Sequence, residues 1–202
     1  MALVNDFDSI IFDYGGVLAT HQTDADLAKL ARLLGVTTDQ FSELYWANRA
    51  EYDRGALTAA EYWMDMLRHS QKNMDAALVD KLTDLDSASW MHFDEPMWDW
   101  IDHLRLAKKR IAVLSNMPRE LGEALKTKTD RLGAFDHVTL SFEVHSVKPE
   151  PAIYEHCLTG LGTTPERTLF FDDRIENVQG AELLGIRAIQ FLDRDEVLEK
   201  LR

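Results

Sequence analysis

Five short apolar runs constrain the fold of this chain more than any other feature. They are Ser9–Asp13, Ile111–Ser115, Val138–Ser141, Thr168–Asp172 and Ile186–Phe191. Runs of this length and composition are typical of strands buried on both faces. From residue 94 onward they alternate with segments that carry helix signals, such as a proline in the first turn at Pro96. This alternation implies right-handed crossovers and predicts an α/β fold with a mostly parallel sheet.

The stretch from about residue 23 to residue 89 lacks this alternation of strand and helix signals and shows no convincing strand. Thr58 and Glu61 are spaced as a capping box, in which each side chain satisfies a free amide at a helix start. Apolar residues fall on one helical face at Leu27, Leu30, Leu33 and Leu34. The chain contains no repeat and no flexible linker, so we expect these helices to form an insertion in the α/β fold.

The charge balance restricts the partners. The chain has 22 Lys and Arg against 35 Asp and Glu, a formal net charge of −13. Such a surface repels nucleic-acid backbones and anionic lipid, so we expect neither nucleic acid nor membrane as a partner. An anionic small molecule could approach only where cations or backbone amides cluster.

The single cysteine and the first residues bear on location. Cys157 alone permits no internal disulfide and fits a reducing compartment. The start, MALVNDFDSIIFD, has no basic region before its apolar run, and no stretch approaches the ~20 apolar residues of a membrane span. We expect a cytoplasmic protein, whose oligomeric state the sequence leaves open.

Polar residues follow the predicted strands at the edge where reactive groups gather in parallel sheets. They are Asp13, Ser115 with Asn116, Lys148, and Asp172 with Asp173. Carboxylates of this kind can hold Mg²⁺ through hard oxygen ligands, Asp13 and Asp173 above all. A lysine, a hydroxyl and helix-start amides can hold the oxygens of a phosphate. This set predicts phosphoryl transfer with Mg²⁺ as cofactor and a small phosphorylated molecule as substrate.

Four segments, in chain order, resemble the motifs of the haloacid dehalogenase-like (HAD) superfamily. They read FDYGGVL, VLSN, VKPEPAIYEH and FFDDRIENVQGAELLGI. The resemblance is greatest to a bacterial branch with glycine in the first motif, which includes an α-D-glucose-1-phosphate phosphatase. It implies a Rossmann-like core formed by residues 1–16 and 93–202, and a small helical cap formed by residues 17–92.

The same resemblance implies the roles of individual residues. Asp13 becomes the nucleophile that carries a transient aspartyl phosphate, and Ser115 and Lys148 complete the catalytic set. The implied phosphate-binding residues are Ser115, Asn116, Lys148, Gly15 and Gly16. The implied metal ligands are Asp13, the backbone carbonyl of Gly15, Asp173 and, as an alternate or indirect ligand, Asp172.

The first motif departs from the phosphatase pattern at Gly15. The family's phosphatases have a second aspartate there, which protonates the leaving group and activates water. Acid–base catalysis of this kind contributes roughly 10²–10⁴-fold, so its loss favours substrates with a stable leaving anion, such as a sugar 1-phosphate. Another group could also deliver the proton, and nothing in the sequence excludes Asp53 or His21. Arg54, beside Asp53, is a candidate for substrate specificity.

Two other functions remain open at this level. A metal-independent 2-haloacid dehalogenase would use the same aspartate, although its first motif reads Asp-x-Tyr-Gly-Thr. A catalytically weakened ligand-binding or partner-binding protein would also explain Gly15. The aromatic residues of the insert are expected to form its core rather than a substrate platform: Tyr45, Trp46, Tyr52, Tyr62, Trp63 and Trp90.

Overall fold

The five predicted strands form one parallel sheet in the computed structural model, which describes residue 4, residues 6–68 and residues 75–201. The strand order is β3-β2-β1-β4-β5. The strands are β1 (Ser9–Phe12), β2 (Arg110–Ser115), β3 (His137–Leu140), β4 (Thr168–Asp172) and β5 (Arg187–Gln190). This arrangement confirms the α/β fold class and the Rossmann-like sheet.

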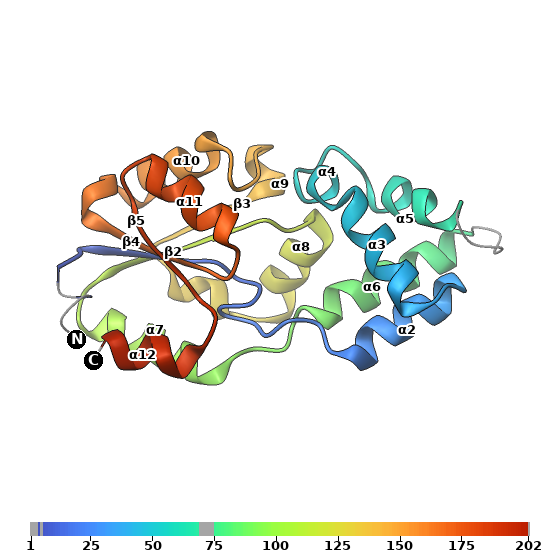
Figure 1. Ribbon diagram of the computed structural model, residues 1–202, viewed down its shortest axis with the longest axis horizontal. Coiled ribbons are helices and arrows are strands. Elements are labelled where there is room, and N and C mark those ends of the chain that lie inside the picture. Colours follow the sequence, from blue (N-terminus) through green and yellow to red (C-terminus); the bar gives the residue numbers. More distant parts are fainter. Residues whose placement is uncertain (1–3, 5, 69–74, 202) are drawn as a thin grey trace.

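Helices cover both faces of this sheet, as Figure 1 shows. One face is covered by α10 (Pro151–Leu161) and α11 (Ile175–Leu183). The other face is covered by α7 (Glu95–Leu106), α8 (Arg119–Lys128) and α12 (Arg194–Leu201). Because both faces are covered, successive residues of β1 are buried on opposite sides, with Ile10 and Phe12 in one cluster and Ile11 in the other.

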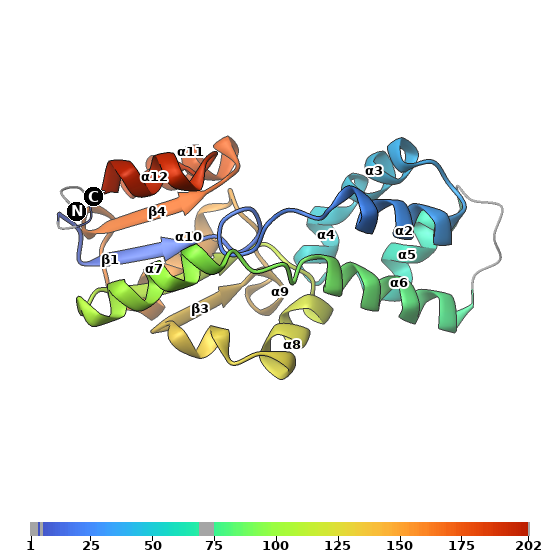
Figure 2. The same ribbon diagram turned by 90° about the horizontal axis from the view of Figure 1, so that it is seen from below.

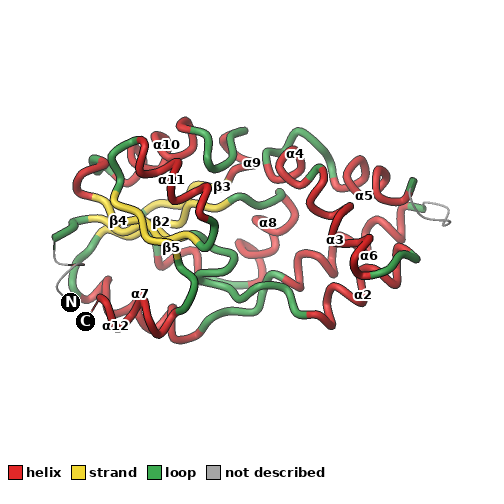
Figure 3. Tube along the Cα trace, in the orientation of Figure 1, coloured by secondary structure: helices red, strands yellow, loops and turns green. Residues whose placement is uncertain are grey.

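The expected insertion consists of helices. They are α2 (Asp24–Leu34), α3 (Thr38–Ala47), α4 (Arg49–Asp53), α5 (Ala59–Leu67) and α6 (Ala76–Ser89). Three of them start with a capping box, and the box predicted at Thr58 and Glu61 is present. The five helices enclose a hydrophobic cluster of their own, separate from the two clusters on the sheet (Figures 1 and 2). They lie beyond the carboxyl ends of the strands. In Figure 3 this part contains helices and loops, and the strands lie in the other part of the molecule.

Two antiparallel segments connect the insertion to the core. The amide of Thr20 donates to the carbonyl of His92 at 2.8 Å, and the amide of Asp94 donates to that of Leu18 at 3.0 Å. The side chains of residues 17–19 pack in the cluster on the sheet. The boundaries 17–92 given above for the cap stay a prediction.

The aromatic residues of the insertion divide into two groups, so part of that expectation was wrong. Tyr45, Tyr52, Tyr62 and Trp63 are buried in the cluster of the insertion, as predicted. Trp46 is 51% exposed, because it lies on the outer side of α3. Trp90 packs instead against the core cluster, next to the loop after β1.

Three short helices complete the described chain: α9 (Ser141–Val144), η1 (Arg131–Ala134) and η2 (Pro165–Arg167). The third apolar run therefore ends one residue earlier as a strand than predicted, since Ser141 begins α9. Among the residues that the structure describes, no helix combines the length and the apolar character needed to cross a membrane.

Candidate active site

The sheet register brings the first and fourth motifs together. Phe12 of β1 pairs with Phe171 of β4, and the amide of Asp13 donates to the carbonyl of Phe171 at 2.8 Å. Asp13 therefore stands beside Asp172 at the carboxyl edge of the sheet. Phe12 pairs on its other side with Val113, which places Ser115 two residues further along β2 at the same edge.

Lys148 lies between the carboxylates of these two strands. Its Nζ is 2.8 Å from Oδ1 of Asp13 and 2.6 Å from Oδ2 of Asp172, and its side chain is 1% exposed. Burial alone would lower the pKa of Lys148, but the two carboxylates outweigh it and raise that pKa above the usual value. The ammonium is thus held in its charged form next to the predicted nucleophile.

Two asparagines fix this arrangement from behind. The side-chain carbonyl of Asn116 accepts from the amide of Lys148 at 2.8 Å, and its NH₂ donates to the carbonyl of Lys148 at 3.0 Å. Asn177 donates to both carboxylate oxygens of Asp172, at 2.9 and 3.1 Å. Since the amide of Asn116 already bonds the lysine backbone on both sides, its geometry favours positioning of Lys148 over direct contact with phosphate.

Gly16 allows the loop after β1 to approach the fourth motif. Its φ is +75°, a conformation that favours glycine, and an added Cβ would lie 2.8 Å from Cγ of Asp173. His21, on the same loop, has its Nε2 3.4 Å from Oδ2 of Asp173 and a side chain that is 65% exposed. Gly16 therefore brings the two loops together, and His21 lies against a predicted metal ligand.

Three carboxylates converge here: Asp13, Asp172 and Asp173 each place an oxygen within 4.8 Å of the others. Burial raises the pKa of Asp13 to about 7 despite Lys148, and burial together with Asp172 raises that of Asp173. One ammonium does not neutralise three such carboxylates, so the site fits a divalent cation with oxygen ligands. The oxygens of Asp172 already accept from Lys148, Asn177 and the amide of Arg174, which leaves Asp13 and Asp173 as the better ligands.

Position 15 is covered by an aromatic ring. A Cβ added to Gly15 would lie 3.1 Å from Cζ3 of Trp90, closer than such contacts usually are. The indole is held in place because its Nε1 donates to the hydroxyl of Tyr45 at 2.9 Å, and the hydroxyl of Tyr14 donates to the carbonyl of Trp90 at 2.8 Å. The space beside Gly15 is therefore filled.

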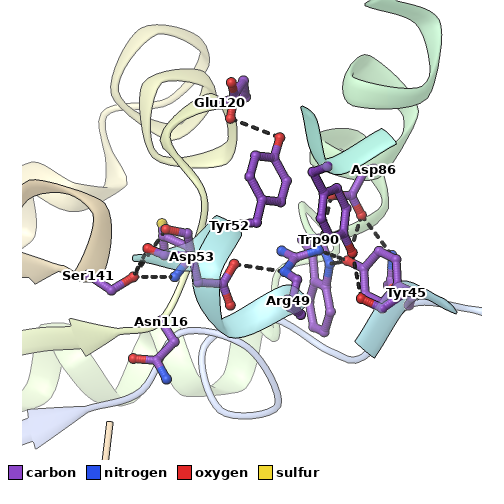
Figure 4. A network of polar contacts seen from close by, with 12 residues as sticks. Tyr45, Arg49, Tyr52, Asp53, Asp86, Trp90, Asn116, Glu120 and Ser141 are labelled. Carbon is purple, nitrogen blue, oxygen red and sulfur yellow. Dashed lines mark hydrogen bonds and ion pairs between the residues drawn. The ribbon is translucent and has the colours of Figure 1, made fainter. Parts of the chain in front are cut away.

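A buried polar network in the insertion borders the site, and sequence reasoning missed most of it (Figure 4). Arg49 is at its centre: its Nε donates to Asp53 at 2.7 Å, and its Nη1 donates to Asp86 at 3.2 Å and to the hydroxyl of Tyr45. The hydroxyl of Tyr45 donates in turn to Asp86 at 2.7 Å. The spacing of four residues between Arg49 and Asp53 was a signal for that pair, whereas Asp86 is distant in sequence.

Arg54, predicted as a specificity candidate, is engaged in an ion pair with the core. Its two terminal nitrogens donate to Glu150 at 2.8 and 2.6 Å, which holds the pKa of that carboxyl at about 2. Nη1 also reaches the carbonyl of His145 at 3.5 Å. These contacts connect the insertion to the loop that carries Lys148, so they support a role in docking rather than in substrate contact.

A glycine in α11 sets the position of the Lys148 loop and gives a stability prediction. A Cβ on Gly180 would lie 2.7 Å from Cβ of Pro149 and 3.1 Å from its carbonyl oxygen. We expect Gly180→Ala to lower the free energy of unfolding by about 1–3 kcal/mol, because α11 and the loop must move apart to accommodate the added methyl group. Chemical denaturation measures this change.

Gly133→Ala is the matched control, since no heavy atom lies within 4 Å of a Cβ added there. We expect it to change the free energy of unfolding by less than about 0.5 kcal/mol. Equal stability of the two variants would show that α11 and the loop are not tightly packed at Pro149.

Fold and site together define the class: a parallel α/β protein with an acidic, lysine-containing site beneath a helical insertion. A family model described as haloacid dehalogenase-like hydrolase matches residues 7–185. The chain belongs to this hydrolase family.

Named relatives and solved structures agree with this membership. The chain is 28% identical over 197 residues to drimenol cyclase drtB of Aspergillus calidoustus, with 96% of this chain and 35% of the cyclase covered. It thus spans about a third of that relative. It is 24% identical to sesquiterpene phosphatase astK of Aspergillus oryzae, with 97% and 95% covered.

Among solved structures, a HAD-family enzyme of Bacteroides thetaiotaomicron in complex with magnesium and inorganic phosphate shares the fold. The TM-score is 0.75 at 20% identity, with 95% of this chain and 98% of that chain covered.

Proposed function

We propose that this chain is a Mg²⁺-dependent phosphomonoesterase that acts on a small phosphorylated metabolite through an aspartyl phosphate on Asp13. The observation that carries the proposal is the buried ammonium of Lys148, held 2.8 Å from Asp13 beside two further carboxylates. A carboxylate can attack phosphorus only where cations neutralise the charge of the phosphate. At this edge of the sheet, Lys148 and a metal ion bound by the carboxylates would supply that positive charge.

The metal ligands in this proposal are Asp13, Asp173 and the backbone carbonyl of Gly15. Mg²⁺ bound there supplies positive charge for the phosphate oxygens. Asp172 has its oxygens occupied by hydrogen bonds and acts on Lys148 rather than on the metal.

The remaining residues have separate tasks. Asp13 attacks the phosphorus atom with one carboxylate oxygen, and Lys148 neutralises charge on the transferring group. The hydroxyl of Ser115 and the amide of Gly15 bind phosphate oxygens. The predicted role of Gly16 in phosphate binding is not supported, because its amide donates to the carbonyl of Ala19 at 2.7 Å. Asn116 holds the backbone of Lys148 and supports phosphate binding through it.

The substrate class rests on the resemblance and on the relatives. The glycine at position 15 connects the chain to the branch that includes an α-D-glucose-1-phosphate phosphatase, and astK carries the name sesquiterpene phosphatase. Sugar 1-phosphates and prenyl phosphates therefore belong first in a substrate panel. A cytoplasmic location agrees with the free thiol of Cys157, which is buried.

Metal removal tests the proposal directly. Purified protein is assayed for phosphate release from p-nitrophenyl phosphate and the substrate panel, with Mg²⁺ and with excess EDTA. We expect turnover with Mg²⁺ to fall at least about 10²-fold in EDTA and to return when Mg²⁺ is added back, because the uncompensated carboxylates repel the phosphate. Full turnover in EDTA would contradict the proposal.

The same assay separates the two alternatives. Halide release from 2-haloacids that persists in EDTA would indicate a dehalogenase instead. Binding of a beryllofluoride phosphate mimic with Mg²⁺, without turnover of any panel member, would indicate a binding protein. The cluster of three carboxylates favours the metal-dependent phosphatase, since a dehalogenase needs no metal.

A further inference from the structure

We propose that Asp53, supplied by the insertion, is the general acid and base of this enzyme and takes over the task for which position 15 has no side chain. The proposal rests on the phosphatase function proposed above. It assigns Asp53 as a further catalytic residue that contacts the leaving oxygen of the substrate.

The loop after β1 has no room at position 15 for a side chain that could act as the acid. Trp90 covers Gly15, and its indole is bonded to Tyr45. The hydroxyl of Tyr45 bonds in turn to Arg49, and Arg49 to Asp53. The ring that fills the place of the missing acid and the proposed new acid therefore belong to one hydrogen-bonded network.

The backbone at Asp53 is fixed to the edge of the active site. Its carbonyl accepts from the hydroxyl of Ser141 at 2.5 Å, and that hydroxyl accepts from the amide of Met117 at 2.9 Å. Met117 lies two residues after Ser115, at the end of β2. The next residue, Arg54, is paired with Glu150 on the loop of Lys148. Figure 4 shows Asp53 between Arg49 and Asn116, on the side of the insertion that faces the strand ends.

The burial and the contacts of the Asp53 carboxyl group suit a role in proton transfer. Its side chain is 9% exposed, and Oδ1 accepts from Nε of Arg49. Among the described residues only Arg49 forms a hydrogen bond to this carboxyl, which leaves Oδ2 for a substrate. Burial raises the pKa of Asp53 to about 6, against the lowering influence of Arg49 and Arg174 and with a raising influence of Asp86. A group of this pKa is well suited to both accept and donate a proton near neutral pH.

The two steps balance through one proton. In the first, an oxygen of Asp13 bonds to phosphorus, the bond from phosphorus to the leaving oxygen breaks, and the protonated carboxyl of Asp53 donates its proton to that oxygen. In the second, water attacks the aspartyl phosphate and gives a proton to the Asp53 carboxylate. The bond between Asp13 and phosphorus breaks, hydrogen phosphate leaves, and both residues return to their starting state.

Leaving-group dependence tests this role. We expect Asp53→Asn to lower kcat/KM about 10²-fold or more for alkyl phosphates, whose alkoxide needs a proton. For p-nitrophenyl phosphate, whose leaving anion is stable, the change should be small. A plot of rate against leaving-group pKa should therefore steepen in the variant, an effect that a structural role alone would not produce.

Asp86→Asn is the matched control, because it removes the other carboxylate partner of Arg49 and disturbs the same network. Because Asp86→Asn keeps the carboxyl group of Asp53, its selective loss for alkyl phosphates should be much smaller than that of Asp53→Asn. Asp53→Glu should restore part of the selective loss. An equal loss for both substrates in Asp53→Asn overturns the inference, while unchanged Mg²⁺-dependent turnover of p-nitrophenyl phosphate keeps the phosphatase proposal intact. Absence of turnover in the unmodified protein overturns both.

Discussion

Replacing Asp13 with asparagine is expected to reduce Mg²⁺-dependent phosphate release by about 10⁴-fold or more, for every substrate that the unmodified protein hydrolyses. The amide of asparagine is a very weak nucleophile, and neither of the two other carboxylates at this edge can replace it. Asp173 is a metal ligand in the proposed function. Asp172 is held by Lys148, Asn177 and the backbone, with no exposed surface. Steady-state phosphate release measures the loss, and a variant that keeps substantial turnover would exclude the aspartyl-phosphate route.

The same variant should not be less stable at pH 8. Burial raises the pKa of Asp13 from 3.8 to about 7, so the folded state binds this proton more tightly than the unfolded chain. The ionised group therefore costs stability as the pH rises from about 4 through about 7, and asparagine removes that cost. Chemical denaturation at pH 8 should show an equal or higher free energy of unfolding, so that lost activity is not lost folding.

Replacing Lys148 with methionine is expected to have the second-largest effect. Methionine fills a similar volume but leaves Asp13 and Asp172 without their shared ammonium in a buried place. We expect a loss of about 10²–10³-fold in kcat. We also expect the free energy of unfolding to fall by about 3–5 kcal/mol, the usual cost of breaking a buried pair from one side.

This destabilisation should depend on pH with a definite sign. Without the lysine, the pKa of Asp13 rises above about 7, since Lys148 lowers it in the unmodified protein. Protonated Asp13 needs no cation, so the stability difference between variant and unmodified protein should be smaller at pH 5 than at pH 8.

Lys126→Met is the control for the Lys148 variant. Lys126 pairs with Glu143 on the surface, and its side chain is 45% exposed, so we expect a change of at most about 1 kcal/mol at either pH. A Lys148→Met variant no less stable than this control would show that the buried pair contributes nothing.

Much of the core could be predicted because its signals are local. Thr168–Asp172 is an uninterrupted apolar run that ends in an acidic pair, and it forms β4 with the predicted bounds. Runs of this kind need helices on both faces, and the helix signals between them supply that covering. The parallel sheet then gathers the strand ends at one edge, which is why Asp13, Lys148 and Asp172 could be expected to meet.

The roles within that edge could not be separated in the same way. Asn116 and Asp172 have the residue types of ligands, yet their side chains are occupied by hydrogen bonds to Lys148. Trp90 was expected in the core of the insertion, and Arg54 was a candidate for contact with substrate. Trp90 instead covers Gly15, and Arg54 binds Glu150, because contacts between distant segments decide which partner a side chain meets.

The five strands, their parallel arrangement and the helical insertion were thus indicated by the sequence alone, and so were the candidate reactive groups, since periodicity and strand-end chemistry are readable within short windows. The order of the strands in the sheet was not predicted. Only the tertiary structure decided that the lysine bridges two carboxylates, that an indole fills the place beside Gly15, and that Asp53 borders the site. These contacts depend on packing between segments that are far apart in the sequence, and no local pattern encodes which residues will be in contact.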